Sequence, residues 1–169
     1  GGRVVQVGPP EEILQNPADD YVRAFFRGVD PTNVISAGDI VRDTHPTIVV
    51  SKKASLRATH ELLSSSEREH LYVLDPKHRF LGIVSSQSLQ QAMESGKSDD
   101  PVDQAFLENA TTVTLDDSMQ AILPLVASSS WPIPVVDEDN VYKGVVSKNR
   151  FLRTLHRTEE QMEKQAEAQ

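Results

Sequence analysis

The chain has 169 residues, of which 38% are hydrophobic and 25% charged, a balance typical of a soluble protein with one domain or two small ones. It has no cysteine, which excludes disulfides, thiol catalysis and cysteine metal sites. Its 17 basic and 25 acidic residues argue against broad nucleic-acid binding, so we expect no nucleic-acid partner. No apolar run approaches the roughly 20 residues that cross a bilayer.

The first 30 residues predict a short strand–helix–helix segment. Val4–Val7 favours a strand and Glu11–Gln15 a short helix, and a second helix carries Tyr21, Phe25 and Phe26 on one side. A strand and two helices are too small to bury these aromatic rings among themselves. We therefore expect this segment to be the end of a larger domain.

In the first half of the remaining chain, the pattern predicts a strand, a helix, two strands and a helix. Ser55 is the expected N-cap of a helix that buries Leu56, Thr59 and Leu63. The expected strands are Thr47–Val50, Leu71–Leu74 and Phe80–Val84, and the last helix carries Leu89, Ala92 and Met93.

The second half predicts the same order of elements. The expected strands are Thr112–Leu115, Ile133–Val136 and Val141–Val146. We expect Asp116 or Asp117 to cap the first helix and Asn149 to cap the second. The first helix carries Met119, Ile122, Leu123 and Val126, and the second turns Phe151, Leu152 and Leu155 inward. Pro124 lies within the first of these helices and predicts a kink or an early end.

The two halves are copies of one unit, 62 residues apart. The matching positions are Val73 and Val135, Asp75 and Asp137, Gly82 and Gly144, and Ser85 and Ser147. The two aspartates lie in hairpin turns, where we expect them to bind their own backbone. The two glycines predict a close backbone approach or a strand distortion. The expected domains are residues 1–30, a first repeat at 31–94, a linker at 95–103, a second repeat at 104–157 and a polar tail at 158–169 that we expect to fray.

Each copy thus reads β-α-β-β-α with an Asp turn and a Gly-apolar-apolar-Ser step, and this pattern resembles the CBS domain. Together the copies resemble a tandem CBS pair over residues 34–156. The resemblance implies an α/β (α+β) fold in which two repeats are related by pseudo-two-fold symmetry. It also implies a homodimer formed through the CBS pairs.

The leading segment adds a second resemblance. Gly2–Gly8, Pro10–Ile13 and Asp20–Asp30 are similar to the join between the ATPase domain and the CBS pair in ATP-binding subunits of glycine betaine/proline betaine ABC importers. This implies a location at the cytoplasmic face of the cell membrane, beside the ATPase domain of the same subunit and the permease. No Gly-x-x-x-x-Gly-Lys-Ser/Thr phosphate loop occurs in the sequence, so we expect no ATP hydrolysis and no catalytic residue in this chain.

Nucleotide-binding CBS pairs continue the Gly-apolar-apolar-Ser/Thr step with x-x-Asp, and here the acidic position holds Ser88 and Arg150. The resemblance implies a cleft between the repeats for an adenine nucleotide or a cyclic dinucleotide, with no cofactor required. Its candidate residues are Ser85, Ser88, Ile133, Pro134, Ser147 and Arg150. The alternative for Ser85 and Ser147 is structural, because each lies where a strand gives way to a helix and can act as an N-cap.

Residues 141–158 contain no carboxylate and carry Lys143, Lys148, Arg150, Arg153 and Arg157. The three arginines follow a spacing that aligns them on one helix face. This face is a candidate site for phosphate or for anionic lipid headgroups, and the alternative is a solvated helix surface. The five histidines lack ligand spacing, so no metal site is predicted.

Three functions remain open. The first is a regulatory CBS pair on an osmoprotectant importer, which modulates ATP-driven uptake in response to ionic strength or osmotic state. The second is a module that senses an adenine nucleotide or a cyclic dinucleotide. The third is a purely structural dimerisation module.

Overall fold

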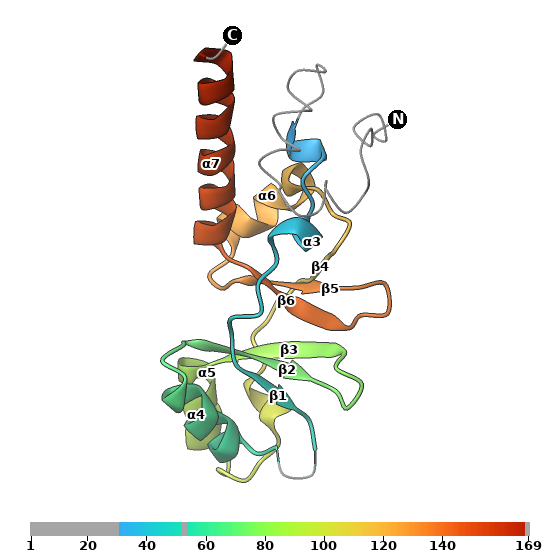
Figure 1. Cartoon of the computed structure of the whole chain (residues 1–169). Coiled ribbons are helices and arrows are strands. Elements are labelled where there is room, and N and C mark those ends of the chain that lie inside the picture. Colours follow the sequence, from blue (N-terminus) through green and yellow to red (C-terminus); the bar gives the residue numbers. More distant parts are fainter. Residues whose placement is uncertain (1–30, 52–53, 168–169) are drawn as a thin grey trace. The chain divides into compact units, whose positions relative to one another are not determined.

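The computed structural model describes residues 31–51 and 54–167, and the predicted strand–helix–helix segment at 1–30 lies outside them. The fold is mixed α+β, with two three-stranded sheets and flanking helices (Figure 1). The described residues form two compact units. Unit 1 comprises residues 31–42, 113–135 and 146–167, and unit 2 comprises residues 43–112 and 136–145.

The elements follow the predicted order of strands and helices. In the first repeat they are η2 (Pro31–Asn33), α3 (Ala37–Ile40), β1 (Thr47–Val49), α4 (Leu56–Ser65), β2 (His70–Leu74), β3 (Phe80–Ser85) and α5 (Ser86–Ser95). After these come η3 (Val102–Ala105), β4 (Val113–Thr114), α6 (Met119–Ser128), β5 (Ile133–Val136), β6 (Tyr142–Val146) and α7 (Lys148–Glu167). None of the helices in the described part of the chain is long and apolar enough to cross a membrane.

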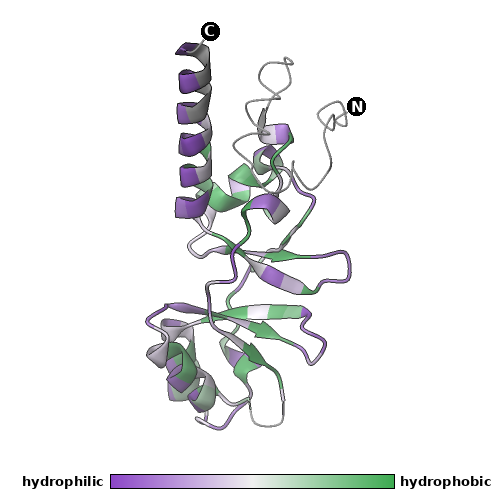
Figure 2. Ribbon diagram, in the orientation of Figure 1, coloured by the Kyte–Doolittle hydropathy of each residue, from purple (hydrophilic) through white to green (hydrophobic). Residues whose placement is uncertain are grey.

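The first sheet has the strand order β1-β2-β3, with β1 parallel and β3 antiparallel to β2. Figure 2 shows that apolar residues lie along the strands of this sheet. Helix α4 begins as predicted, because the Ser55 hydroxyl accepts a hydrogen bond from the Ala58 amide at 3.2 Å. Leu56, Thr59 and Leu63 are buried, which confirms the predicted inner face of this helix.

Gly82 lies where the backbone of β3 closely approaches another segment of unit 2. A Cβ atom at this position would lie 2.9 Å from the Phe106 ring. The amide of the next residue, Leu107, donates to the carbonyl of Ile83 at 2.8 Å, so the chain is fixed against this strand. The repeat-related Gly144 has a φ of 136°, a conformation that residues with a Cβ rarely adopt. Both glycines therefore fill the structural role predicted for them.

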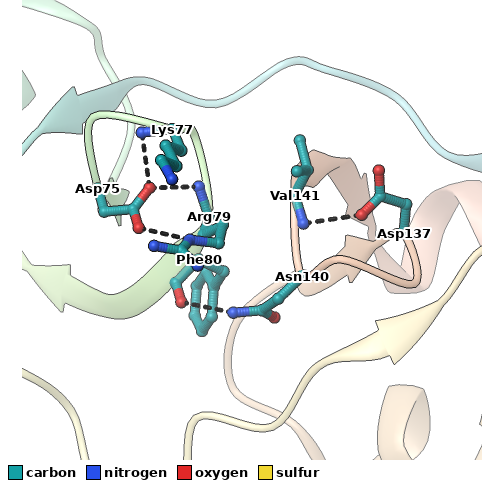
Figure 3. A network of polar contacts seen from close by, with 7 residues as sticks. All are labelled: Asp75, Lys77, Arg79, Phe80, Asp137, Asn140 and Val141. Atoms are coloured by element: carbon teal, nitrogen blue, oxygen red, sulfur yellow. Dashed lines mark hydrogen bonds and ion pairs between the residues drawn. The ribbon is translucent and has the colours of Figure 1, made fainter.

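The two hairpin turns are built alike, as the repeat predicts (Figure 3). The Asp75 carboxylate accepts from the amides of Lys77 and Arg79, each at 2.8 Å. The Asp137 carboxylate accepts from the amides of Asp139 and Val141, each at 2.9 Å. Both carboxylates therefore accept hydrogen bonds from backbone amides of their own turn, which confirms their predicted role.

The tip of the second hairpin is part of unit 2, where it pairs with the first hairpin. The Phe80 amide donates to the Asn140 carbonyl at 3.0 Å, and the Tyr142 amide donates to the His78 carbonyl at 2.9 Å. The Asn140 side-chain amide also donates to the Phe80 carbonyl at 3.1 Å (Figure 3). His78 and Asn140 both have positive φ values, 63° and 65°. The ring of Tyr142 stacks on that of the buried Tyr72 with 5.6 Å between centroids.

Unit 1 contains a separate core formed by residues from α3, β4, α6, β5, β6 and α7. Its buried members include Ile35, Ile40, Met119, Ile122, Val126, Ile133, Val146 and Phe151. Three backbone bonds join the segment before and within α3 to the start of α6: Ala37 donates to Asp117, Gly38 to Leu115, and Met119 to Ile35. These bonds satisfy polar groups that the packed core would otherwise leave without water.

The predicted caps of α6 and α7 are wrong by one or two residues. Ser118 caps α6 by accepting from the Ala121 amide at 3.1 Å, because Asp117 instead accepts from the Thr114 amide at 2.8 Å. At α7 the Ser147 hydroxyl accepts from the Arg150 amide at 3.0 Å and takes the place predicted for Asn149.

Three details of these helices differ from the sequence pattern. Helix α6 continues past Pro124 to Ser128, so of the two predicted alternatives, a kink or an early end, the early end is wrong. Leu152, predicted to face inward, is 60% exposed, and Leu123, which the helical spacing grouped with Met119, Ile122 and Val126, is 47% exposed. Helix α7 runs to Glu167, so the segment predicted to fray continues the helix.

Replacing Gly82 with alanine should destabilise the chain by about 1–3 kcal/mol, because the new methyl group would overlap the Phe106 ring. Thermal or urea unfolding measures this loss. Leu81→Ala is the control on the same strand, since Leu81 is 46% exposed. Adding Phe106→Leu to Gly82→Ala should recover part of the loss, and an unchanged stability of Gly82→Ala would contradict the close approach.

Substitutions at Asn140 separate its two contributions to the paired turns. Asn140→Gly keeps the positive φ and removes the bond to Phe80, at an expected cost of about 0.5–1.5 kcal/mol. Asn140→Ala should cost about 1–2 kcal/mol more, because alanine resists the left-handed conformation. Urea unfolding of both variants tests this order, and equal stabilities would show that the conformation contributes nothing.

Candidate anion-binding site

The site is built around Arg150, in the first turn of α7. The Ser147 hydroxyl accepts from the Arg150 backbone amide and fixes the start of the helix. The side chain of Arg150 then reaches the end of α3, where its Nε donates to the carbonyl of Ile40 at 3.4 Å. Ile40 is fully buried, so this carbonyl is a fixed anchor for the guanidinium group.

Three other arginines lie close enough to this guanidinium group to act on it electrostatically. Burial lowers the pKa of Arg150 below its usual value, and repulsion by the three neighbouring cations lowers it further. These cations are Arg42, Arg157 and Arg153, in order of their effect. Arg42 follows α3, and its Nη1 donates to the carbonyl of Val41 at 3.0 Å. We call Arg42, Arg150, Arg153 and Arg157 the arginine cluster.

Within the described part of the chain, no carboxylate forms an ion pair with any member of the arginine cluster. Arginine stays protonated in proteins, so the mutual repulsion cannot be relieved by loss of a proton. A bound anion would relieve it, because guanidinium groups present planar pairs of donors to phosphate and carboxylate oxygens. The arrangement is therefore suited to binding anions.

The lysines that the sequence grouped with these arginines are placed differently. Lys143 belongs to unit 2 and lies 3.8 Å from the Asp137 carboxylate, so its charge is partly balanced there. Lys143 lies on β6, two residues after the hairpin turn, and its place in the predicted basic face stays a prediction. Lys148 is the exposed first residue of α7 and is not among the cations that act on Arg150.

The hydroxyls predicted for a nucleotide cleft are engaged in helix caps. In unit 2 the Ser85 hydroxyl accepts from the Ser88 amide at 2.9 Å, and the Ser88 hydroxyl accepts from the Ser85 amide at 2.9 Å. In unit 1 the Ser147 hydroxyl caps α7, and Ile133 and Pro134 are buried. The structural reading of Ser85 and Ser147 is thus correct. Each hydroxyl still carries a hydrogen that it can donate to a ligand.

Unit 2 also contains an open surface pocket of about 440 Å³ beside α5. Ser88 is the one residue of the predicted cleft that lines it. The other polar groups at the pocket come from α5, from η3 and from the segment that follows η3, and include Gln91, Ser95, Gln104 and Glu108.

Sequence reasoning missed Arg42. It lies far from α7 in the sequence, and the short helix that precedes it was not predicted, so no sequence signal pointed to it. The contact of Arg150 with the last carbonyl of that helix brings the two arginines into one cluster.

Comparison with known proteins agrees with the repeat. The family described as "CBS domain" matches residues 34–95 and 98–157. The chain is 41% identical over 158 residues to the glycine betaine/proline betaine transport system ATP-binding protein ProV of Escherichia coli K12. This match covers 92% of the chain and 38% of ProV, so the chain spans well under half of that relative.

Solved structures show the same fold. Staphylococcus aureus OpuCA superposes with a TM-score of 0.60 at 16% identity, over 70% of this chain and 97% of that one. The protein CbpB, solved in complex with c-di-AMP, superposes with a TM-score of 0.60 at 14% identity, over 78% and 86% of the two chains.

Ser85→Ala should destabilise the chain by about 1 kcal/mol, because it removes the acceptor at the start of α5. Ser85→Asp should restore most of the stability, since a carboxylate caps the helix and complements its dipole. Chemical unfolding checks both variants. Ser64→Ala, at an exposed hydroxyl inside α4, is the matched control and should change stability by less than about 0.5 kcal/mol. Equal effects of Ser85→Ala and Ser64→Ala would refute the cap.

Proposed function

Because the chain belongs to the CBS-domain family and carries two CBS domains in tandem, we propose that it is the regulatory pair of an osmoprotectant importer. In this proposal it is part of the ATP-binding subunit of an ABC-type glycine betaine/L-proline transporter. The similarity to ProV over 92% of the chain supports this assignment. The chain acts beside the ATPase domain of its own subunit and the permease, at the cytoplasmic face of the membrane.

The arginine cluster is the observation that carries the proposed mechanism. Arg42, Arg153 and Arg157 repel the guanidinium group of Arg150, and none of the four arginines forms an ion pair with a carboxylate of the described residues. An anionic membrane surface would supply the missing negative charge. Attraction between exposed charges is screened over about 10 Å at 0.1 M salt and over about 3 Å at 1 M. The cluster therefore binds the membrane at low ionic strength and releases it as salt rises.

Release from the membrane then permits ATP-driven uptake. This sequence of events makes the importer active when the cytoplasm becomes concentrated, which is when an osmoprotectant is needed. The chain itself does no chemistry in this mechanism. Its contribution is to make the state of the transporter depend on ionic strength.

A second candidate is a nucleotide sensor, and the position of Arg150 favours it. Arg150 occupies the place where nucleotide-binding CBS pairs carry an acidic residue, and a guanidinium group suits a phosphate. The solved complex of CbpB with c-di-AMP is a structural neighbour that supports an adenine nucleotide or a cyclic dinucleotide as ligand. A third candidate is dimerisation alone, through the exposed leucines Leu123 and Leu152 on α6 and α7.

The test of the proposal is uptake by the complete importer in vesicles that contain anionic lipid. Reversing Arg150, Arg153 and Arg157 to glutamate should remove the attraction and allow transport at low ionic strength. The salt concentration that gives half-maximal uptake should fall. Uptake of labelled glycine betaine at a series of internal salt concentrations measures this threshold.

A charge-matched control reverses Arg57, Lys77 and Lys97, which are exposed in unit 2. This variant should keep the wild-type threshold. The proposal is wrong if the α7 reversals leave the threshold unchanged, or if the control shifts it equally. Calorimetry with AMP, ADP, ATP and cyclic dinucleotides separates the second candidate, since micromolar binding to one of them would make the module a nucleotide sensor.

A further inference from the structure

Helix α7 carries its charges in two opposite halves. Residues 148–157 contain Lys148, Arg150, Arg153 and Arg157 and no carboxylate. Residues 158–167 contain Glu159, Glu160, Glu163 and Glu167 with the single cation Lys164. This arrangement opposes the helix dipole, which favours acidic residues at the start of a helix and basic residues at its end. The division of the charges into a basic and an acidic half therefore does not stabilise the isolated helix.

Six of the polar residues form a straight line along the exposed side of α7. They are Asn149, Arg153, His156, Glu160, Glu163 and Glu167, with spacings that alternate between four and three. Such spacing keeps residues on one side of a helix. All six are exposed, and the buried residues Phe151 and Thr154 hold the other side against the core of unit 1. We call this line the polar stripe.

We propose that the polar stripe pairs with the same stripe of a second copy of the chain, with the two α7 helices antiparallel. A two-fold axis midway along the helix, near residue 158, then places Arg153 opposite Glu163 of the second copy. The same axis places His156 opposite Glu160 and Asn149 opposite Glu167. The two numbers in each pair have the same sum, as a two-fold axis requires.

Charge complementarity selects both the partner and the direction. In a parallel pair each Arg153 would face the other Arg153, and each glutamate would face its own copy, which is repulsive at Arg153 and at all three glutamates. In the antiparallel pair the basic half of each helix faces the acidic half of the other. Among the described residues, the one salt-bridge contact of the stripe joins the His156 ring to the Glu160 carboxylate at 3.0 Å within one helix, and it is ionic only when His156 is protonated.

The contact adds orientation and salt dependence to a dimer. Exposed ion pairs contribute little energy individually, whereas complementary charges fix the register of two surfaces and speed their encounter. Arg150 and Arg157 lie beside the stripe, on one flank of the helix. The antiparallel arrangement brings this flank from both copies to the same side, so that the pair presents twice the positive charge there.

This inference goes beyond the proposed function, because it needs neither lipid nor the transporter. The test is sedimentation velocity of the 169-residue chain at about 0.05 M and about 0.5 M NaCl, without lipid. Arg153→Glu and Glu163→Arg should each weaken self-association about tenfold at low salt, because two attractive contacts per dimer become repulsive. The double variant with both changes should restore association to about the wild-type value, since each contact is again between opposite charges.

Loss of the helix cannot mimic this result. Both single substitutions make the charges of α7 more favourable for the helix dipole, so helix content measured by circular dichroism should be maintained. Glu94→Arg and Lys97→Glu, which are exposed at the end of α5 and just after it, are matched controls and should leave association unchanged.

Disulfide formation between introduced cysteines measures the direction of pairing, because the chain has no cysteine of its own. Arg153→Cys mixed with Glu163→Cys should form a mixed disulfide faster than either variant links to itself. The inference is wrong if the wild-type chain is monomeric at low salt, if neither single variant weakens association, or if the double variant is as weak as the singles. It is also wrong if Arg153→Cys links mainly to itself, as a parallel pair would. Because Arg153 belongs to both the polar stripe and the arginine cluster, membrane binding is tested separately with substitutions at Arg42, Arg150 and Arg157, which lie outside the stripe.

Discussion

Repulsion among guanidinium groups is the constraint on which this account depends. Arg150 is partly buried, its Nε is bound to the last carbonyl of α3, and three other arginines act on it. The repulsion that these three exposed cations exert on Arg150 is unfavourable, and a bound anion would offset it. The fold sustains this arrangement because Ser147 fixes the first turn of α7 and the buried face of that helix packs into the core of unit 1.

The end of α3 and the start of α7, which the Arg150 side chain joins, are each held by local hydrogen bonds. The same devices recur in unit 2, where Ser55 and Ser85 cap α4 and α5 and the two aspartates close the hairpin turns. The scaffold of the repeat is thus specified by short-range hydrogen bonds. The arginine cluster is superimposed on this scaffold in one copy only, because the position equivalent to Arg150 in the first repeat is Ser88.

The scaffold could be predicted from the sequence because its determinants are local and periodic. Ser55 followed by Leu56, Thr59 and Leu63 defines a cap and one helix face, and the structure has both. The cap of α6 could not be predicted reliably, since Asp116, Asp117 and Ser118 all suit the position. Which residue caps α6 depends on Thr114, whose backbone amide donates to the Asp117 carboxylate and so leaves the cap to Ser118. Arg42 was missed because its link to α7 is a tertiary contact without a sequence signal.

The most direct measurement of the central claim is binding of the 169-residue chain to vesicles of phosphatidylglycerol as a function of salt, with phosphatidylcholine vesicles as the reference. The account predicts binding to the anionic vesicles at about 0.05 M salt, its loss at about 0.5 M, and its absence at any salt when Arg42, Arg150 and Arg157 are replaced by glutamine. Binding that is equal to both lipids, or that survives the three substitutions, would contradict it.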